Sequence, residues 1–466
     1  MPGQLRAHPF MPNSAPPLKA ALLAQLGVES AEDLFEQIPA AHRFQGDLRQ
    51  PPALTSELAL SRHLNGLLKR NIPASEQLSF LGGGCWHHHV PAVVDEIVGR
   101  SEFLTPVWGT PSSDFGRNQA WFEFTSQLGA LLELELVGLP VYSWGCAAGH
   151  ALRMAARLTG RRRVLVPAHM CPERRAVIET YCASANPASA IQVDAVACDA
   201  AGRLDIEALA ALADESVAAV YFENPAFLGG LEVQAAEIGA LAREVGAETI
   251  VGVDPISLGV VAPPGAYGAD IAVGTIQPLG IHMAAGGGLG GFIASRDEAR
   301  YAAEYPTLLN SIAETVEGEM SFGLTLFHQS SYGSREEGND WTGNSTYLWA
   351  VGASVYMALL GPEGFREVGD LIMSRAHRAA DALAEVSGIR LPVMSGFFKE
   401  FVINFDASGR SVAEVNAALR ERGIFGGLDL SSTFPTVGQS ALYCFTELHA
   451  PEDIDRLATA LKEVLA

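Results

Sequence analysis

Between about Tyr142 and Ser295 the sequence alternates short apolar strands with amphipathic helices, and this alternation restricts the possible folds more than any other feature. Strands are expected in RRVLVPAHM, IQVDAVACD, VAAVYFENP, ETIVGVDP, ADIAVG and GGFIAS. Helices are expected between the earlier ones, in LDIEALAALA and QAAEIGALAREVG, and before them in HALRMAARLTG. Strands of this length separated by helices indicate βαβ units, so the pattern predicts an α/β fold with a largely parallel sheet.

Different patterns flank this region and suggest three parts. Residues 17–70 have the composition of helices, and a Gly-rich loop at 82–84 follows them. Residues 346–360 form a long apolar helix that should end at Gly361-Pro362, a common helix stop. We therefore predict a helical N-terminal arm (1–89), a large α/β domain (90–345), and a linker helix with a small C-terminal α+β domain (346–466).

Charge and apolar content exclude two classes of partner. The chain has 31 Lys+Arg against 53 Asp+Glu, a net charge of −22, which argues against nucleic-acid binding because phosphate contacts need a basic face. No stretch approaches the roughly 20 apolar residues of a membrane span. Six scattered cysteines without a CxxC pair are typical of a reducing compartment, so we expect a cytoplasmic protein. No metal site is expected, because the adjacent His87, His88 and His89 point in different directions.

One acid and one missing lysine define the expected site. The layout resembles that of fold-type-I pyridoxal phosphate (PLP) enzymes, in which an acid after a strand pairs with the pyridinium nitrogen and a lysine holds the cofactor. Asp254 is the candidate acid; alternatively it caps a turn before Pro255. The lysine should follow about one strand later, but the chain has only Lys19, Lys69, Lys399 and Lys462. The sequence thus predicts the shell of a PLP enzyme without its cofactor lysine.

Several other segments could be functional or merely structural. Glu223-Asn224-Pro225 ends a predicted strand, where ligands of parallel sheets bind, but such residues also form turns. The glycines at 286–291 could cradle a phosphate, although a tight turn between strands is favoured. Trp108 and Trp144 could line a pocket or only pack.

A family resemblance accounts for the missing lysine. Segments spread over most of the chain resemble the N-terminal (α) subunit of glycine decarboxylase, the P-protein of the glycine cleavage system. They include FLGGG, PAVVDEIVGRSEF, PISLGVVAPPGAYGADIAVG, YMALLGPEGFREVGDL, FFKEFVINF and VAEVNAALRERGIFGGLDL. In this family the cofactor lysine belongs to the β half, and the resemblance places Gln277 at its histidine and Pro278 at its lysine. Asp254 and Gln277 would then be relics of a cofactor site.

The resemblance also implies an assembly and a reaction. It implies an α₂β₂ complex with a PLP-bearing β subunit of similar fold, in which this chain holds no catalytic residue of its own. PLP would serve to decarboxylate glycine, and the aminomethyl group would pass to a lipoyl carrier protein. The substrate would be a small amino acid, and this chain would shape the active site of its partner.

Loops that the resemblance places near the active site depart from the family pattern. Segments 84–91, 107–117, 143–151 and 328–346 are rewritten, while the core segments are retained. From these loops we take His88, Trp108 and Asp114 as candidate substrate or interface residues. Three interpretations remain open: the ordinary α subunit of glycine decarboxylase, the α subunit of a paralogous biosynthetic PLP enzyme that uses glycine or another small amino acid, and a non-catalytic scaffold or regulatory partner.

Overall fold

A computed structural model of the chain consists of two compact units, residues 1–72 and 73–466, which are described separately. The described residues are 7, 10–44, 46, 49–73, 76–84, 86–103, 111–283, 290–325, 334–335, 338, 340, 342, 346–393 and 396–466, without the side chains of 111–116 and 325.

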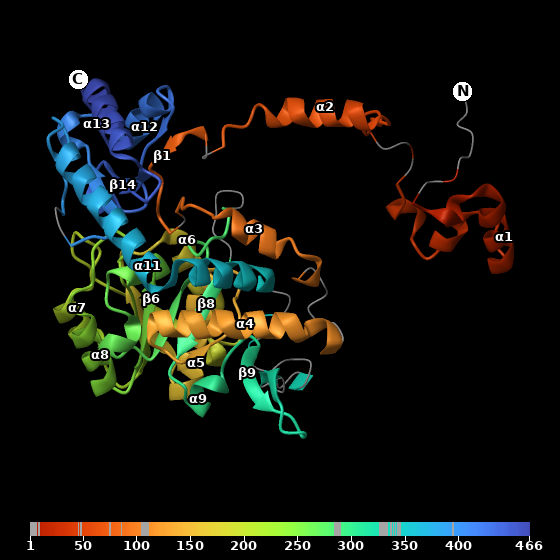
Figure 1. Ribbon diagram of the computed structural model, residues 1–466, viewed down its shortest axis with the longest axis horizontal. Coiled ribbons are helices and arrows are strands. Elements are labelled where there is room, and N and C mark those ends of the chain that lie inside the picture. Colours follow the sequence, from red (N-terminus) through yellow and green to blue (C-terminus); the bar gives the residue numbers. More distant parts are fainter. Residues whose placement is uncertain are drawn as a thin grey trace. The chain divides into compact units, whose positions relative to one another are not determined.

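A seven-stranded sheet forms the centre of the second unit (Figure 1). Its strand order is β2-β8-β7-β6-β5-β3-β4. The five strands from β7 to β4 are parallel to their neighbours, and β8 runs antiparallel to both β7 and β2. The strands are β2 (Leu136–Val137), β3 (Arg163–Pro167), β4 (Gln192–Val196), β5 (Val217–Glu223), β6 (Glu248–Val253), β7 (Ile271–Thr275) and β8 (Gly291–Ser295). The predicted α/β fold with a largely parallel sheet is confirmed.

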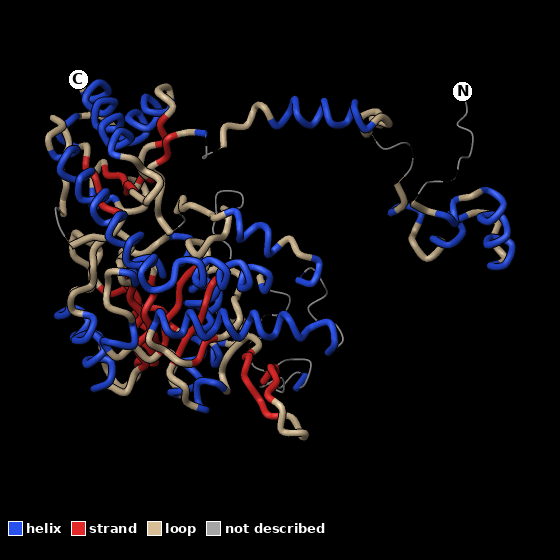
Figure 2. The backbone as a smooth tube through the Cα atoms, in the orientation of Figure 1, coloured by secondary structure: helices blue, strands red, loops and turns tan. Residues whose placement is uncertain are grey.

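Helices cover both faces of this sheet (Figure 2), which explains why β5, β6, β7 and β8 are buried at every position and are mostly apolar. Along β6, Ile250 packs into one hydrophobic cluster while Val251 and Val253 pack into the other. The first cluster contains α5 (Trp144–Thr159) and α6 (Pro172–Cys182). The second contains α4 (Pro111–Leu132), α7 (Ile206–Leu212), α8 (Ala235–Glu244) and the start of α11 (Tyr347–Ala384).

The long helix α11 connects the sheet region to the C-terminal region and breaks where the sequence predicts. Gly361 has φ 59° and ψ −177° inside α11, a conformation open to glycine, and Pro362 follows. Beyond it lies a three-stranded antiparallel sheet in the order β11-β14-β13, packed against helices α12 and α13. These elements are β11 (Glu400–Asn404), α12 (Val412–Arg420), β13 (Leu428–Asp429), β14 (Ser440–Cys444) and α13 (Pro451–Leu465).

Shorter elements complete the second unit. Strand β1 (Leu78–Ser79) pairs in parallel with β12 (Ile424–Phe425), so the segment that leads to the glycine loop is attached to the C-terminal region. The hairpin of β9 (Leu309–Glu314) and β10 (Met320–Thr325) was not among the expected elements. Helices α3 (Ala92–Val98) and α9 (Ala299–Ala302) are short.

The first unit consists of helices without a core of its own. It contains α1 (Pro16–Leu26) and α2 (Glu57–Leu68), and Ser56 caps α2 by accepting a hydrogen bond from the amide of Ala59. None of its described residues is buried. The three-part division at residues 89 and 345 stays a prediction. In the part of the chain that the structure describes, no helix combines the length and apolarity needed to cross a membrane.

Candidate functional site

Asp254, the acid expected for the cofactor nitrogen, lies at the end of β6 and is buried. Its Oδ1 accepts a hydrogen bond from the Ile256 amide, so it caps the short 3-10 helix at Pro255–Gly259. Its Oδ2 lies 2.6 Å from the Nζ of Lys399, and both side chains are about 97–98% buried. The acid is therefore both a turn cap and half of a buried ion pair.

A tryptophan and a histidine surround the ammonium group of Lys399. Nζ lies 3.4 Å from the centroid of the Trp86 ring, a cation–π contact, and 3.0 Å from Nε2 of His88. The Nδ1 of His88 lies 2.8 Å from Oε2 of Glu447. Since an ammonium group can only donate, Nε2 of His88 accepts and its Nδ1–H donates to Glu447. Both ring nitrogens of His88 are thus used within the chain.

Glu447 ends this chain of contacts as a carboxylate. Burial raises its pKa, but the His88 ring and the amide of His89, which donates to Oε1, outweigh burial and lower the pKa to about 2. Glu447 follows β14 and Lys399 precedes β11, whereas His88 belongs to the loop after β1. The contacts therefore join segments from three distant parts of the sequence.

A second buried ion pair lies against the same cavity. Arg174 makes two hydrogen bonds to Glu223, of 2.9 and 2.8 Å, and its guanidinium lies 3.9 Å from the centroid of the Trp144 ring. The hydroxyl of Tyr221 also donates to Glu223. Burial lowers the pKa of Arg174, but the carboxylate of Glu223 raises it by more, so the guanidinium stays charged. Glu223, at the end of β5, is thus a structural acid rather than a turn residue.

The glycines of FLGGG allow the loop to approach Arg174 and Glu400 closely. A Cβ on Gly84 would lie 2.5 Å from Nη1 of Arg174, and its φ of +101° also favours glycine. A Cβ on Gly82 would lie 2.0 Å from Oε1 of Glu400, which accepts a hydrogen bond from the amide of Gly83. The loop can therefore close over the cavity only because these residues have no side chain.

The residues around Asp254 and at the expected lysine position do not fit PLP. Pro278 stands at the expected lysine position and has no amine. Gln277 is buried and uses its amide group on the backbone of Trp86, donating to its carbonyl and accepting from its amide. The cavity between Asp254, Lys399, Trp86 and Trp144 has a volume of about 20 Å³. That is room for about one water molecule, and Lys399 already neutralises the acid that would bind the ring nitrogen.

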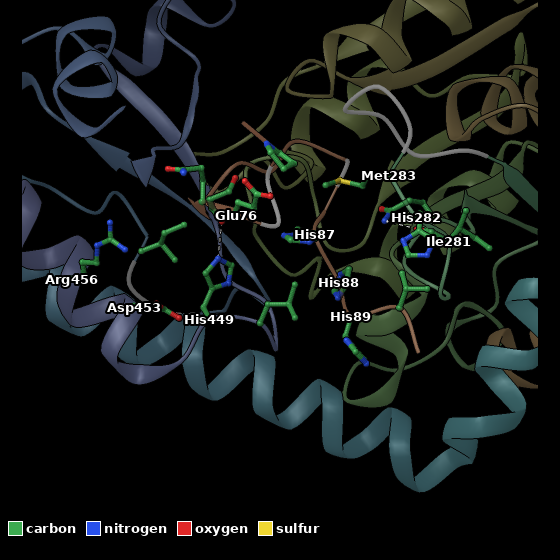
Figure 3. Close-up of a pocket in the computed structure, with 17 residues that line it drawn as sticks. Glu76, His87, His88, His89, Ile281, His282, Met283, His449, Asp453 and Arg456 are labelled. Atoms are coloured by element: carbon green, nitrogen blue, oxygen red, sulfur yellow. Dashed lines mark hydrogen bonds between the residues drawn. The ribbon is translucent and has the colours of Figure 1, made fainter. Parts of the chain in front are cut away.

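A larger pocket of about 760 Å³ lies on the other side of His88, whose ring contacts Lys399 of the small cavity (Figure 3). Gln277 also lines the larger pocket and donates to the carbonyl of Trp86, which lines the small cavity. Its lining includes His87, His88, His89, His282 and His449 together with Glu76, Asp453 and Arg456. The ring of His87 is half-buried, and burial lowers its pKa, so it is neutral at pH 7. Among the described residues, no group of three or more His, Cys, Asp or Glu converges closely enough to hold a metal ion.

Comparison with known proteins settles the family. Residues 10–461 match the family described as glycine cleavage system P-protein.

The chain belongs to the glycine cleavage system P-protein family.

Curated members and a solved structure cover almost the whole chain. The probable glycine dehydrogenase (decarboxylating) subunit 1 of Staphylothermus marinus is 34% identical, over 98% of this chain and 98% of its own length. The corresponding protein of Thermococcus onnurineus is 36% identical, over 98% and 99%. A crystal structure of glycine decarboxylase (P-protein) in inhibitor-bound form is 34% identical with a TM-score of 0.86, over 98% of this chain and all of that chain. The resemblance seen in the sequence is confirmed.

Within this P-protein chain, the predicted site residues fall into two groups. Asp254 and His88 both contact Lys399, and Gln277 binds the backbone of Trp86 beside it. Pro278 follows Gln277 in the sequence and is buried. Trp108 and the glycines 286–288 lie outside the described residues, and Asp114 lies in α4 without a described side chain. The roles proposed for His88, Trp108 and Asp114 toward a substrate or partner stay predictions.

Sequence analysis did not select several residues of the buried ion pairs and of the contacts around them. Lys399, Arg174, Trp86 and Glu447 gave no motif with a known spacing. Lys399-Glu400 does carry a signal, because two charged residues interrupt the apolar segment FFKEFVINF. Charged residues within a buried apolar segment need partners, so Lys399 and Glu400 together indicate a polar site. Nothing in the sequence identifies Asp254 or Trp86 as the partners of Lys399.

Proposed function

We propose that this chain is the α subunit of a glycine decarboxylase and that it lacks the cofactor lysine. A β subunit of similar fold holds PLP, and two copies of each subunit form an α₂β₂ assembly. PLP on the β subunit supplies the electron sink for the decarboxylation of glycine, and the aminomethyl group passes to a lipoyl carrier protein. This chain contributes surface and charge beside the partner's active site rather than a cofactor site of its own.

The observation that supports this proposal is the state of the relic cofactor position. The acid Asp254 is kept, but the lysine position is Pro278 and Lys399 pairs with the acid. The sequence of residues 10–461 matches the family. A subunit that keeps the family fold while its own side chains occupy the cofactor position is what we expect when the partner subunit holds the cofactor. The names of the relatives, subunit 1, support the existence of a second subunit.

Borohydride reduction tests where PLP is held. The chain is co-expressed with a candidate β subunit from the same organism, purified as a complex, reduced in the presence of PLP and mapped by peptide mass spectrometry. We expect a pyridoxyl-lysine only in β-subunit peptides. A pyridoxyl group on Lys399 or Lys69 of this chain would contradict the proposal, and so would failure of the two chains to co-purify at micromolar concentration.

A second candidate, the α subunit of a biosynthetic PLP enzyme, is favoured by the rewritten loop at 84–91. His88, the one histidine there that aligns with the family's loop, has both ring nitrogens bound within the chain, so it offers no polar atom to a substrate. Glycine labelled at C1 separates the candidates. Label exchange with CO₂ in the presence of lipoyl carrier supports the decarboxylase, and a product that retains the carboxylate supports the biosynthetic enzyme. No turnover of any amino acid supports a scaffold.

A further inference from the structure

The surroundings of the Lys399 ammonium have the composition of a binding site for an organic cation. A carboxylate (Asp254), the face of an indole ring (Trp86) and an imidazole nitrogen (His88) lie within 3.4 Å of Nζ. A carboxylate and an aromatic face are the groups that proteins use to bind ammonium ligands, and the contact is strongest when water is excluded. Here the lysine and the acid are both almost fully buried.

The three groups belong to segments that are distant from Lys399 in the sequence. Asp254 ends β6 in the sheet region, and Trp86 and His88 lie in the loop after β1. Lys399 immediately precedes β11 of the C-terminal region. One side chain therefore crosses from the C-terminal region into the sheet region. The neighbouring Glu400 adds a second link, because it accepts the hydrogen bond from the Gly83 amide.

We propose that Asp254, Trp86 and His88 form a binding site for a primary alkylammonium ion, and that the chain's own Lys399 is its ligand. The ammonium stands beside the acid that a PLP enzyme would keep for the ring nitrogen. The bound lysine fastens the C-terminal region to the sheet region and fixes the wall of the histidine pocket through His88. The inference concerns the chain's own residues and does not depend on which subunit holds PLP.

Chemical rescue of a truncated lysine tests the site. In the Lys399→Ala variant of the full chain, the three carbons from Cγ to Cε and the ammonium are removed, and Asp254 loses its cation. We expect a lower melting temperature than that of the wild-type chain. Propylammonium chloride should then raise the melting temperature of the variant in a saturable way, because a ligand that binds only the folded state stabilises it. Wild type, whose site is filled, should show no saturable response.

Three controls separate the site from effects of salt or of losing any lysine. Sodium chloride at the same concentrations should not reproduce the saturable shift. In Lys399→Ala/Asp254→Asn the cap on the Ile256 amide is kept through Oδ1, but the charge is gone, and propylammonium should bind at least about tenfold more weakly. Lys462→Ala, a change at an exposed lysine of α13, should melt like the wild type with or without the amine.

The outcomes decide the inference in either direction. Equal rescue of the single and double variants, or no rescue of a folded Lys399→Ala chain, would overturn it. If Lys399→Ala does not fold, recovery of soluble, cooperatively melting protein by refolding with propylammonium but not with sodium supports the site, and equal recovery with both salts overturns it. The readout is melting in the absence of PLP, so failure here leaves the peptide-mapping test of the proposed function intact.

Discussion

At the scale of single residues, two buried ion pairs occupy the place where this fold would hold a cofactor. Each cation faces a carboxylate on one side and an indole ring on another: Lys399 with Asp254 and Trp86, and Arg174 with Glu223 and Trp144. Removing one partner of a buried pair leaves an uncompensated charge, which costs much more than the pair itself contributes. The two ion pairs therefore stabilise the arrangement in which the protein's own side chains occupy this cavity.

Arg174 and its neighbour Arg175 offer a matched test of burial. We expect Arg174→Met to lower the free energy of unfolding by about 3–5 kcal/mol, because it leaves Glu223 buried without its cation. Arg175→Met should cost about 0–1 kcal/mol, since the Glu179 side chain that it pairs with is 53% exposed. Urea titration of both variants gives the two values. Equal losses would show that burial of Glu223 does not set the cost, and adding Glu223→Gln to Arg174→Met should recover part of the loss.

His150 predicts a specific pH dependence of stability. Burial lowers its pKa from 6.5 to about 4, and its Nε2 contacts the hydroxyl of Thr342. The unfolded chain therefore takes up a proton at this residue below pH 6.5 while the folded chain does not, so its contribution to stability is present above pH 6.5 and is lost as the pH falls toward 4. Between pH 7.5 and pH 5 this residue should account for a loss of about 2 kcal/mol.

The comparison of wild type with His150→Gln isolates this residue from the other histidines. Urea titrations at both pH values should show a smaller pH-dependent loss in the variant, by about the same 2 kcal/mol. An unchanged difference between pH 7.5 and pH 5 would mean that His150 titrates normally in the folded chain.

At the scale of elements, the sheet was predictable and the site was not. Strands such as Val217–Glu223 and Glu248–Val253 are apolar at nearly every position because both faces are covered, and that signal is local in sequence. The ion pair of Asp254 with Lys399 joins residues 145 positions apart (399 − 254), and no local pattern encodes such a contact. The hairpin at 309–325 was missed because its strands alternate polar and apolar residues weakly.

The break in α11 at Gly361 predicts that a substitution there destabilises the fold through the backbone conformation alone. A Cβ added there would meet no atom within 4 Å, but φ +59° with ψ −177° is a region open almost only to glycine. Gly361→Ala should therefore lower the free energy of unfolding by about 1–3 kcal/mol without any steric clash. Gly323→Ala in β10, also in open space but with an ordinary φ, should change it by less than about 1 kcal/mol. Similar losses in the two variants would argue against backbone strain as the cause.

At the scale of the whole molecule, the scarcity of lysine in the sequence has a structural counterpart. The chain has four lysines, and one of them, Lys399, is buried against Asp254. The other signal, a net charge of −22, does not by itself identify a partner surface. Residues from the loop after β1, the end of β6 and the C-terminal region meet in one cavity, so the site is a property of the tertiary fold and could not be read from any segment alone.

The division into two units predicts how a protease attacks the isolated chain. Every buried residue in the part of the chain that the structure describes lies within 73–466, whereas Arg49, Lys69 and Arg70 of the first unit are exposed and lie outside its α-helices. Because cleavage needs locally open, unprotected backbone, trypsin at low ratio should cut first at these residues and leave a long-lived fragment that begins at Asn71. N-terminal sequencing and intact mass identify the fragment, and its melting temperature should equal that of the full chain, since the first unit adds no buried contact of its own. A first cut within the sheet-forming segment 136–283, or a fragment that melts well below the full chain, would show that the first unit protects the second.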